Sequence, residues 1–162
     1  MNTFFAFRDF GGRGDIPIVD AHFDIYESGD ERLDLFYEAE GLTWTGKWVN
    51  TFANINVIRL AEMYLTRAEA NHQAGTSVGN TPVNDINVIR ARAGLTPLGA
   101  VSLDDIKRER QIELAFEGQR IHDLRRWKDN TGDFPYNDPA IVFPIPQREI
   151  DANANLNQNP GY

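Results

Sequence analysis

The sequence contains no cysteine among its 162 residues. This absence excludes disulfide bonds, thiol nucleophiles, cysteine-ligated zinc and iron–sulfur clusters within the chain. No apolar run approaches the ~18 residues that a membrane-spanning helix needs. The first residues carry no basic head followed by an apolar stretch, so they do not resemble a secretory signal peptide.

Basic residues are also in the minority. Sixteen Lys and Arg stand against 24 Asp and Glu, which gives a net charge of −8. Nucleic-acid binding requires a basic face that releases counterions from phosphates, so we expect no nucleic-acid partner. The composition, 41% hydrophobic and 25% charged, is that of a folded chain of one-domain length.

Patterns typical of metal binding and nucleophilic catalysis are missing as well. The three histidines, His22, His72 and His122, share no metal-ligand spacing. No His-Glu-x-x-His or Gly-x-Ser-x-Gly pattern occurs. We therefore expect no metal ion, no cofactor and no nucleophilic catalysis.

Residues 1–50 are rich in aromatic side chains, with six of the ten phenylalanines and two of the three tryptophans. They show no sustained helical period. The sequence predicts an irregular segment with at most one or two short strands, at residues 18–26.

Residues 51–128 carry helical patterns and are predicted to form the core. A first helix is predicted from near Asn54 to Gly75, a residue suited to the left-handed conformation that follows a helix. A second begins after Thr81 and stops at Gly94. The short polar connection predicts that the two form an antiparallel pair resembling a tetratricopeptide unit.

A third, long helix is predicted to start at Ser102, with Asp105 completing a capping box, and to run to Gly118. After a bend at that glycine, helical turns are predicted to continue to Lys128.

Residues 129–162 are rich in proline and are predicted to be extended, with one helical turn after Pro146. The predicted fold is therefore mainly α, with a helix pair, a long third helix, an irregular N-terminal segment and an extended tail. We expect these parts to form a single region over 1–162.

Charged residues gather on and near the third helix. Glu109, Glu113 and Glu117 follow one another at intervals of four, so they lie on one helical face. Glycoside hydrolysis needs two carboxylates on opposite sides of a sugar, which a single stripe does not provide. We interpret the cluster as a structural ion-pair network with partners at Arg59, Arg67, Arg90 and Arg92; its members are Glu109, Arg110, Glu113, Glu117, Arg120, Asp123 and Arg126.

Aromatic rings are the candidate ligand-binding groups. A pyranose has an apolar face that can lie on an indole or phenol ring, while polar neighbours bind its hydroxyls. Trp44 and Trp48, with Tyr26 and Tyr37 upstream, are the candidates. The alternative is that these rings fill the seam between the irregular segment and the helices.

Five strings of residues, in order, carry a resemblance to a known family. They are RLAEMYLTRAEA (59–70), DINVIRARAG (85–94), IKRERQIELAFEGQRIHDLRRW (106–127), FPIPQREI (143–150) and QNPGY (158–162). With the upstream DER at 30–32, they resemble the C-terminal portion of the SusD/RagB family over about 28–162.

This resemblance implies a non-catalytic, glycan-binding surface lipoprotein of the Bacteroidetes outer membrane, the partner of a SusC-like TonB-dependent transporter. Family members carry an anchoring cysteine and, before the region that is matched here, several tetratricopeptide-like helix pairs. This sequence contains neither the cysteine nor those upstream pairs, so membrane attachment would come only through a lipid anchor that is absent from it. Two alternatives remain open. One is a helical scaffold that contacts the transporter or takes up peptides, as in the RagB branch. The other, more remote, is a glycoside hydrolase.

Overall fold

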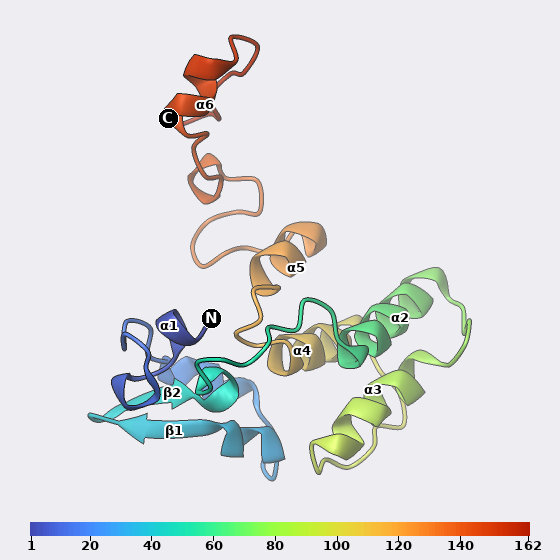
Figure 1. The fold of residues 1–162 in the computed structure, drawn as a ribbon. Coiled ribbons are helices and arrows are strands. Elements are labelled where there is room, and N and C mark those ends of the chain that lie inside the picture. The colour runs from blue at the N-terminus through green and yellow to red at the C-terminus, as the bar shows by residue number, and fades with distance from the viewer. The chain divides into compact units, whose positions relative to one another are not determined.

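The computed structural model describes all residues from Met1 to Tyr162, which form two compact units, Met1–Glu117 and Gly118–Tyr162. The first unit contains a two-stranded hairpin and three packed helices; the second contains two short helices and the tail (Figure 1). The fold is mainly helical, as predicted.

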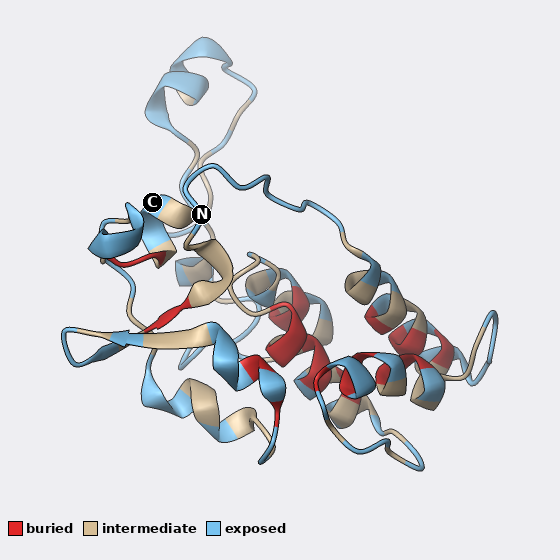
Figure 2. Ribbon diagram, turned by 60° about the horizontal axis from the view of Figure 1, so that its bottom comes forward, coloured by how far each residue is buried: buried red, intermediate tan, exposed pale blue.

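Helices α2 (Leu60–Ala74), α3 (Pro82–Arg92) and α4 (Leu103–Glu113) form the helical core of the first unit. Both α3 and α4 pack on α2, and the buried residues of these helices lie where the three meet (Figure 2). The hydrophobic cluster between them consists of Leu65, Ala68, Ile86, Ile89, Ile106 and Leu114.

In the antiparallel pair α2–α3, the end of α2 and the start of α3 lie where the sequence predicts them. Gly75 follows α2 with φ +65°, in the left-handed region that glycine adopts without strain. Thr81 caps α3, and its hydroxyl accepts a hydrogen bond from the Asn84 N–H. In the connection, the Asn71 side chain donates to the carbonyls of Val78 and Asn80 at 3.0 Å each.

The start of α2 was predicted wrongly. The helix begins at Leu60, with Arg59 as its N-cap, and not near Asn54. The apolar residues Ile55 and Ile58, which appeared to extend the helical period upstream, are 54% and 68% exposed. They lie in an irregular segment, residues 51–59.

Helix α4 begins as predicted and ends earlier. Ser102 and Asp105 form the capping box, with both reciprocal hydrogen bonds present. The helix ends at Glu113 rather than at Gly118, and Phe116 adopts a positive φ of 64°. What was predicted as one bent helix is therefore two helices separated by an irregular turn.

The strands lie elsewhere than predicted. Strands β1 (Phe36–Ala39) and β2 (Leu42–Thr45) pair antiparallel through a two-residue turn in which both residues have positive φ. This is the geometry that joins right-twisted strands. Residues 20–25, by contrast, form a 3-10 helix, η2 (Asp20–Ile25), and only Ile18 bridges to β2, at Thr43.

Short helices complete the N-terminal segment. They are α1 (Asn2–Phe5), η1 (Arg8–Phe10), η3 (Glu31–Leu35) and η4 (Gly46–Trp48).

The second unit contains α5 (Arg120–Trp127), η5 (Pro139–Ile141) and α6 (Gln147–Ala152), the last following Pro146 as predicted. Its tail folds back on itself. The Gln158 side chain accepts from the Ile145 N–H at 2.8 Å and donates to the Ile145 carbonyl at 2.9 Å. No helix in the structure is both long enough and apolar enough to span a membrane.

Replacing Ser102 by alanine removes the hydroxyl that accepts from the Asp105 N–H, so the free energy of unfolding should fall by about 1 kcal/mol. Urea denaturation measures the change. Ser77→Ala is the matched control, because Ser77 is exposed in the connection between α2 and α3. Equal losses in the two variants would contradict the capping role.

Candidate functional site

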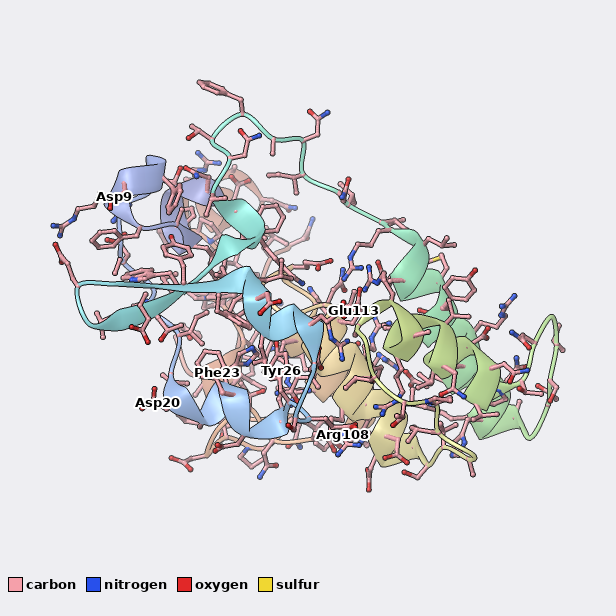
Figure 3. The ribbon with its side chains drawn as sticks, turned by 90° about the horizontal axis from the view of Figure 1, so that it is seen from below. Asp9, Asp20, Phe23, Tyr26, Arg108 and Glu113 are labelled. Carbon is pink, nitrogen blue, oxygen red and sulfur yellow. The ribbon has the colours of Figure 1, made fainter.

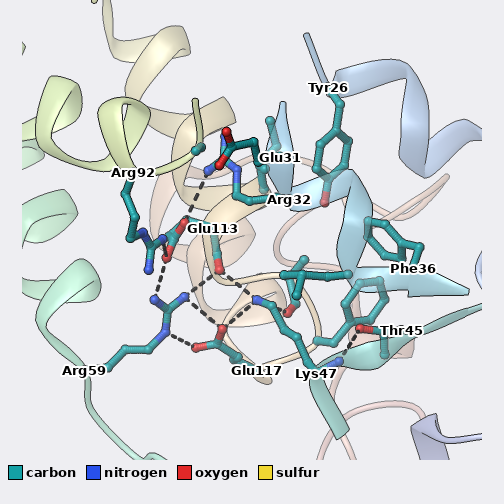
Figure 4. A pocket seen from close by; sticks show the side chains of 15 residues that line it. Tyr26, Glu31, Arg32, Phe36, Thr45, Lys47, Arg59, Arg92, Glu113 and Glu117 are labelled. Atoms are coloured by element: carbon teal, nitrogen blue, oxygen red, sulfur yellow. Dashed lines mark hydrogen bonds and ion pairs between the residues drawn. The ribbon is translucent and has the colours of Figure 1, made fainter. Parts of the chain in front are cut away.

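The carboxyl end of α4 borders a cavity of about 320 Å³ within the first unit. Figure 4 shows charged side chains from several segments converging there, including Glu31 and Arg32 of η3. Glu113 and Glu117 come from the end of α4 and the turn after it, Arg59 from the start of α2, Arg92 from the last turn of α3, and Lys47 from η4.

Glu113 is the centre of this cluster. Its side chain is 2% exposed, and its carboxylate accepts hydrogen bonds from Arg59 at 2.5 Å, from Arg32 at 3.3 Å and from Arg92. Burial alone would raise the pKa of Glu113, but the hydrogen bonds from Arg59 and Arg92 lower it to about 2. Glu113 is therefore held in its ionised form.

Glu117 sits beside it. Its carboxylate accepts from the Lys47 ammonium at 2.7 Å and from Arg59 Nε at 2.7 Å. Burial lowers the pKa of Lys47, and Glu117 counteracts that shift.

The backbone carbonyls at this end of α4 are bound by the same cations. Lys47 donates to the carbonyls of Glu113 and Ala115 at 2.9 and 3.0 Å, and Arg59 donates to the Glu113 carbonyl at 2.5 Å. The Trp48 indole N–H donates to the Phe116 carbonyl at 2.9 Å. The last carbonyls of a helix have no partner within it and carry partial negative charge, so cations stabilise this end.

Glu109, one turn earlier, anchors a second group. It accepts from Arg32 at 2.6 Å, and Arg90 lies 3.7 Å away. Arg32 also forms two hydrogen bonds with Asp30, and Arg90 forms two with Glu27. Burial raises the pKa of Glu109 despite the neighbouring Arg32.

Only some of the predicted members of the ion-pair network meet. Arg59, Arg90 and Arg92 are partners of the α4 carboxylates, as interpreted from the sequence. Arg67 instead pairs with Asp85, at 2.6 Å. Arg110 lies 3.7 Å from Glu62, and the remaining three predicted members belong to the second unit; they are Arg120, Asp123 and Arg126, with Arg126 donating to Asp123 at 2.9 Å.

Two members of the site were missed at the sequence level. Arg32 and Lys47 lie 81 and 66 residues from Glu113 in the chain. The only sequence signal for Arg32 was the DER string upstream of the other motifs. Lys47 stands between Trp44 and Trp48 in a segment without helical or strand periodicity, so no pattern in the sequence marks it as a partner of Glu113.

Aromatic rings form the other wall of the cavity. Tyr26, Phe36 and Phe116 line it, and the rings of Phe36 and Phe116 are 5.8 and 5.1 Å from that of His22. Phe23 lies on η2 and Tyr26 directly follows it, with Tyr26 on the side toward Glu113 (Figure 3). Burial raises the pKa of Tyr26 to about 12 and lowers that of His22.

The four candidate rings do not form one surface. Trp44 is 1% exposed and packs against Phe7 at 5.3 Å, so its ring has no face open to a ligand. The Tyr37 hydroxyl accepts from the Phe7 N–H at 2.9 Å. Tyr26 lines the larger cavity, whereas Trp48 lines a second cavity of about 200 Å³.

The chemistry of the cavity suits binding better than acid–base catalysis. A general acid must carry a proton near neutral pH. Glu113, with a pKa of about 2, carries none, and Glu117 is paired with Lys47 and Arg59. No group of three or more His, Asp or Glu side chains is arranged to hold a metal ion.

Glu113→Gln should lower the free energy of unfolding by roughly 3–5 kcal/mol, because it leaves buried arginine charge without its partner. Chemical denaturation measures the change. Glu38→Gln, on the exposed side of β1, is the matched control and should be nearly neutral. A Glu113→Gln variant as stable as wild type would contradict the structural role.

The stabilisation from Glu113 should also depend on pH. Because its folded pKa of about 2 lies below the ordinary value of 4.5, ionised Glu113 stabilises the fold above pH 4.5, and this contribution is lost as the pH falls toward 2. The difference in unfolding free energy between wild type and Glu113→Gln should therefore shrink over that interval. A difference that stays constant from pH 7 to pH 2.5 would show that the carboxylate charge is not responsible.

Comparison with known proteins identifies the family. The model described as "SusD family" matches residues 38–140 and 128–162. The starch-binding protein SusD of Bacteroides thetaiotaomicron is 35% identical over 128 residues, a match that covers 67% of this chain and 22% of the relative.

Two solved structures are similar over most of the chain. Surface glycan-binding protein A from Bacteroides uniformis superposes with a TM-score of 0.78 at 25% identity, covering 91% of this chain and 41% of that one. A laminarin-binding SusD-like protein superposes with a TM-score of 0.68 at 28% identity, covering 90% and 38%. The chain thus spans about a fifth of the starch-binding relative and about two-fifths of the solved chains. The chain belongs to the SusD family.

Proposed function

We propose that this protein binds a nutrient glycan at the cell surface without cleaving it, as the partner of a TonB-dependent outer-membrane transporter. The observation that carries the proposal is the family match over residues 38–162, because SusD proteins are non-catalytic binding proteins. Relatives named for starch and for laminarin support a glycan as the ligand class.

The geometry at the end of α4 supports binding without turnover. Glu113 and Glu117 are occupied by arginine and lysine partners, so neither is free to protonate a leaving group. Among the four candidate rings, Trp48 and Tyr26 line cavities, and they are the rings that we propose for ligand contact.

Attachment to the outer membrane through a lipid is part of this proposal. It requires a cysteine, which these 162 residues do not contain, so the lipid would be carried elsewhere in the polypeptide.

A second candidate role, protein contact with the transporter, is supported by one exposed segment. Phe52, Val57 and Ile58 are 95%, 81% and 68% exposed, and Leu60 at the start of α2 is 67% exposed. Neighbouring exposed apolar side chains of this kind often mark protein-interaction surfaces.

Affinity electrophoresis in gels that contain starch or laminarin tests the glycan proposal. We expect retarded migration in at least one polysaccharide and no release of reducing sugar from either. Association with the transporter but no retardation in any glycan gel would favour the scaffold or peptide-uptake role. Release of reducing sugar that disappears in Glu113→Gln would instead establish a hydrolase.

A further inference from the structure

A second, smaller cavity lies beside the charged cluster. Its volume is about 200 Å³, below the roughly 300–1,000 Å³ of pockets that enclose a drug-sized ligand, so it suits one unit of a longer chain. The residues that line it come from η4, from the irregular segment before α2 and from the turn after α4; they are Lys47, Trp48, Ala53, Asn54, Asn56, Arg59 and Glu117.

The irregular segment turns its polar residues to this cavity. Asn54 and Asn56 line it, whereas Ile55 and Val57 do not, although they are 54% and 81% exposed. Apolar burial therefore does not hold this segment in place. Its two ends are held instead, by the Trp48 carbonyl that accepts from Asn2 and by the ion pairs of Arg59.

The two cations that line this cavity, Lys47 and Arg59, already bind acceptors of the protein. The Lys47 ammonium makes three hydrogen bonds, which is its full donor capacity, and Arg59 makes four. An anionic ligand would have to displace Glu117 from both cations. The cavity therefore does not select for a carboxylated or sulfated ligand.

The polar groups of this cavity that have no hydrogen-bond partner in the protein are two neutral side-chain amides. The side chains of Asn54 and Asn56 form no hydrogen bond within the protein, and each carboxamide offers donors and an acceptor. That combination can bind adjacent hydroxyls of a sugar ring, which donate and accept at neighbouring positions. Trp48 has its N–H bound to the Phe116 carbonyl, so what it can offer a ligand is its ring.

We propose that Asn54, Asn56 and Trp48 form a binding site for one neutral hexose unit of a polysaccharide. This inference rests on the proposed glycan-binding function and gives it a location and a ligand charge. The amides bind the hydroxyls, the indole packs against the apolar ring face, and Lys47 and Arg59 fix the wall behind them.

The test is isothermal titration calorimetry of the full chain with maltoheptaose, laminariheptaose and an oligogalacturonate. The double variant Asn54→Ala/Asn56→Ala should lose about tenfold in affinity for the neutral ligand that wild type binds, as expected for two lost hydrogen bonds. Its folding should be unaffected, since both side chains are exposed and make no hydrogen bond within the protein. The matched control is Ile55→Ala/Val57→Ala in the same segment, which should bind as wild type does.

The outcomes separate this site from the function on which it rests. Wild-type binding with equal affinity in the Asn54→Ala/Asn56→Ala variant would overturn the site and leave glycan binding standing. Tighter, salt-sensitive binding of the oligogalacturonate would overturn the neutral ligand class. A wild-type chain that binds neither neutral oligosaccharide would overturn the site and the proposed function together.

Discussion

The carboxyl end of α4 is where the first unit is held together. Lys47, Arg59 and Trp48 donate to the carbonyls that the helix leaves unpaired, and the arginines of three segments meet on Glu113. These donors come from four parts of the chain: η3, η4, the start of α2 and the end of α3. This helix terminus therefore joins the irregular N-terminal segment to the helical core, together with the Arg32–Glu109 and Arg90–Glu27 pairs one turn earlier.

The same interactions determine what chemistry remains. A buried charge is tolerated only when it is paired and hydrogen-bonded, so the glutamates of α4 are fully used in holding their arginines. Glu109, Glu113 and Glu117 are therefore not free to exchange protons with a substrate. It also commits most donors of Lys47 and Arg59 to protein acceptors. In the proposed hexose site, recognition therefore falls to neutral groups beside the network, which are the amides of Asn54 and Asn56 and the ring of Trp48.

Local signals predicted the parts of the fold that local physics determines. Thr81 and Ser102 cap their helices, and Gly75 ends α2, because these effects act within a few residues. The start of α2 could not be predicted in this way. The apolar spacing of Ile55 and Ile58 continues the helical period upstream. The helix nevertheless starts after Arg59, whose side chain forms ion pairs with Glu113 and Glu117, more than fifty residues away in the sequence. The hairpin was missed because its strands have four residues each, too few to show a period.

The candidate site was predictable to the extent that it lies on one helix. The interval of four residues predicted that Glu109, Glu113 and Glu117 share one helical face and form ion pairs. Arg32 and Lys47, by contrast, come from a segment without periodicity, so their part in the network could not be predicted. Ring type alone could not separate a binding residue from a packing residue. Trp44 and Trp48 are four residues apart, yet Trp44 is 1% exposed on β2 while Trp48 lines a cavity on η4. The strand ends at Thr45, so Trp48 lies outside the hairpin that buries Trp44, and η4 brings its indole to the cavity that Asn54 and Asn56 also line.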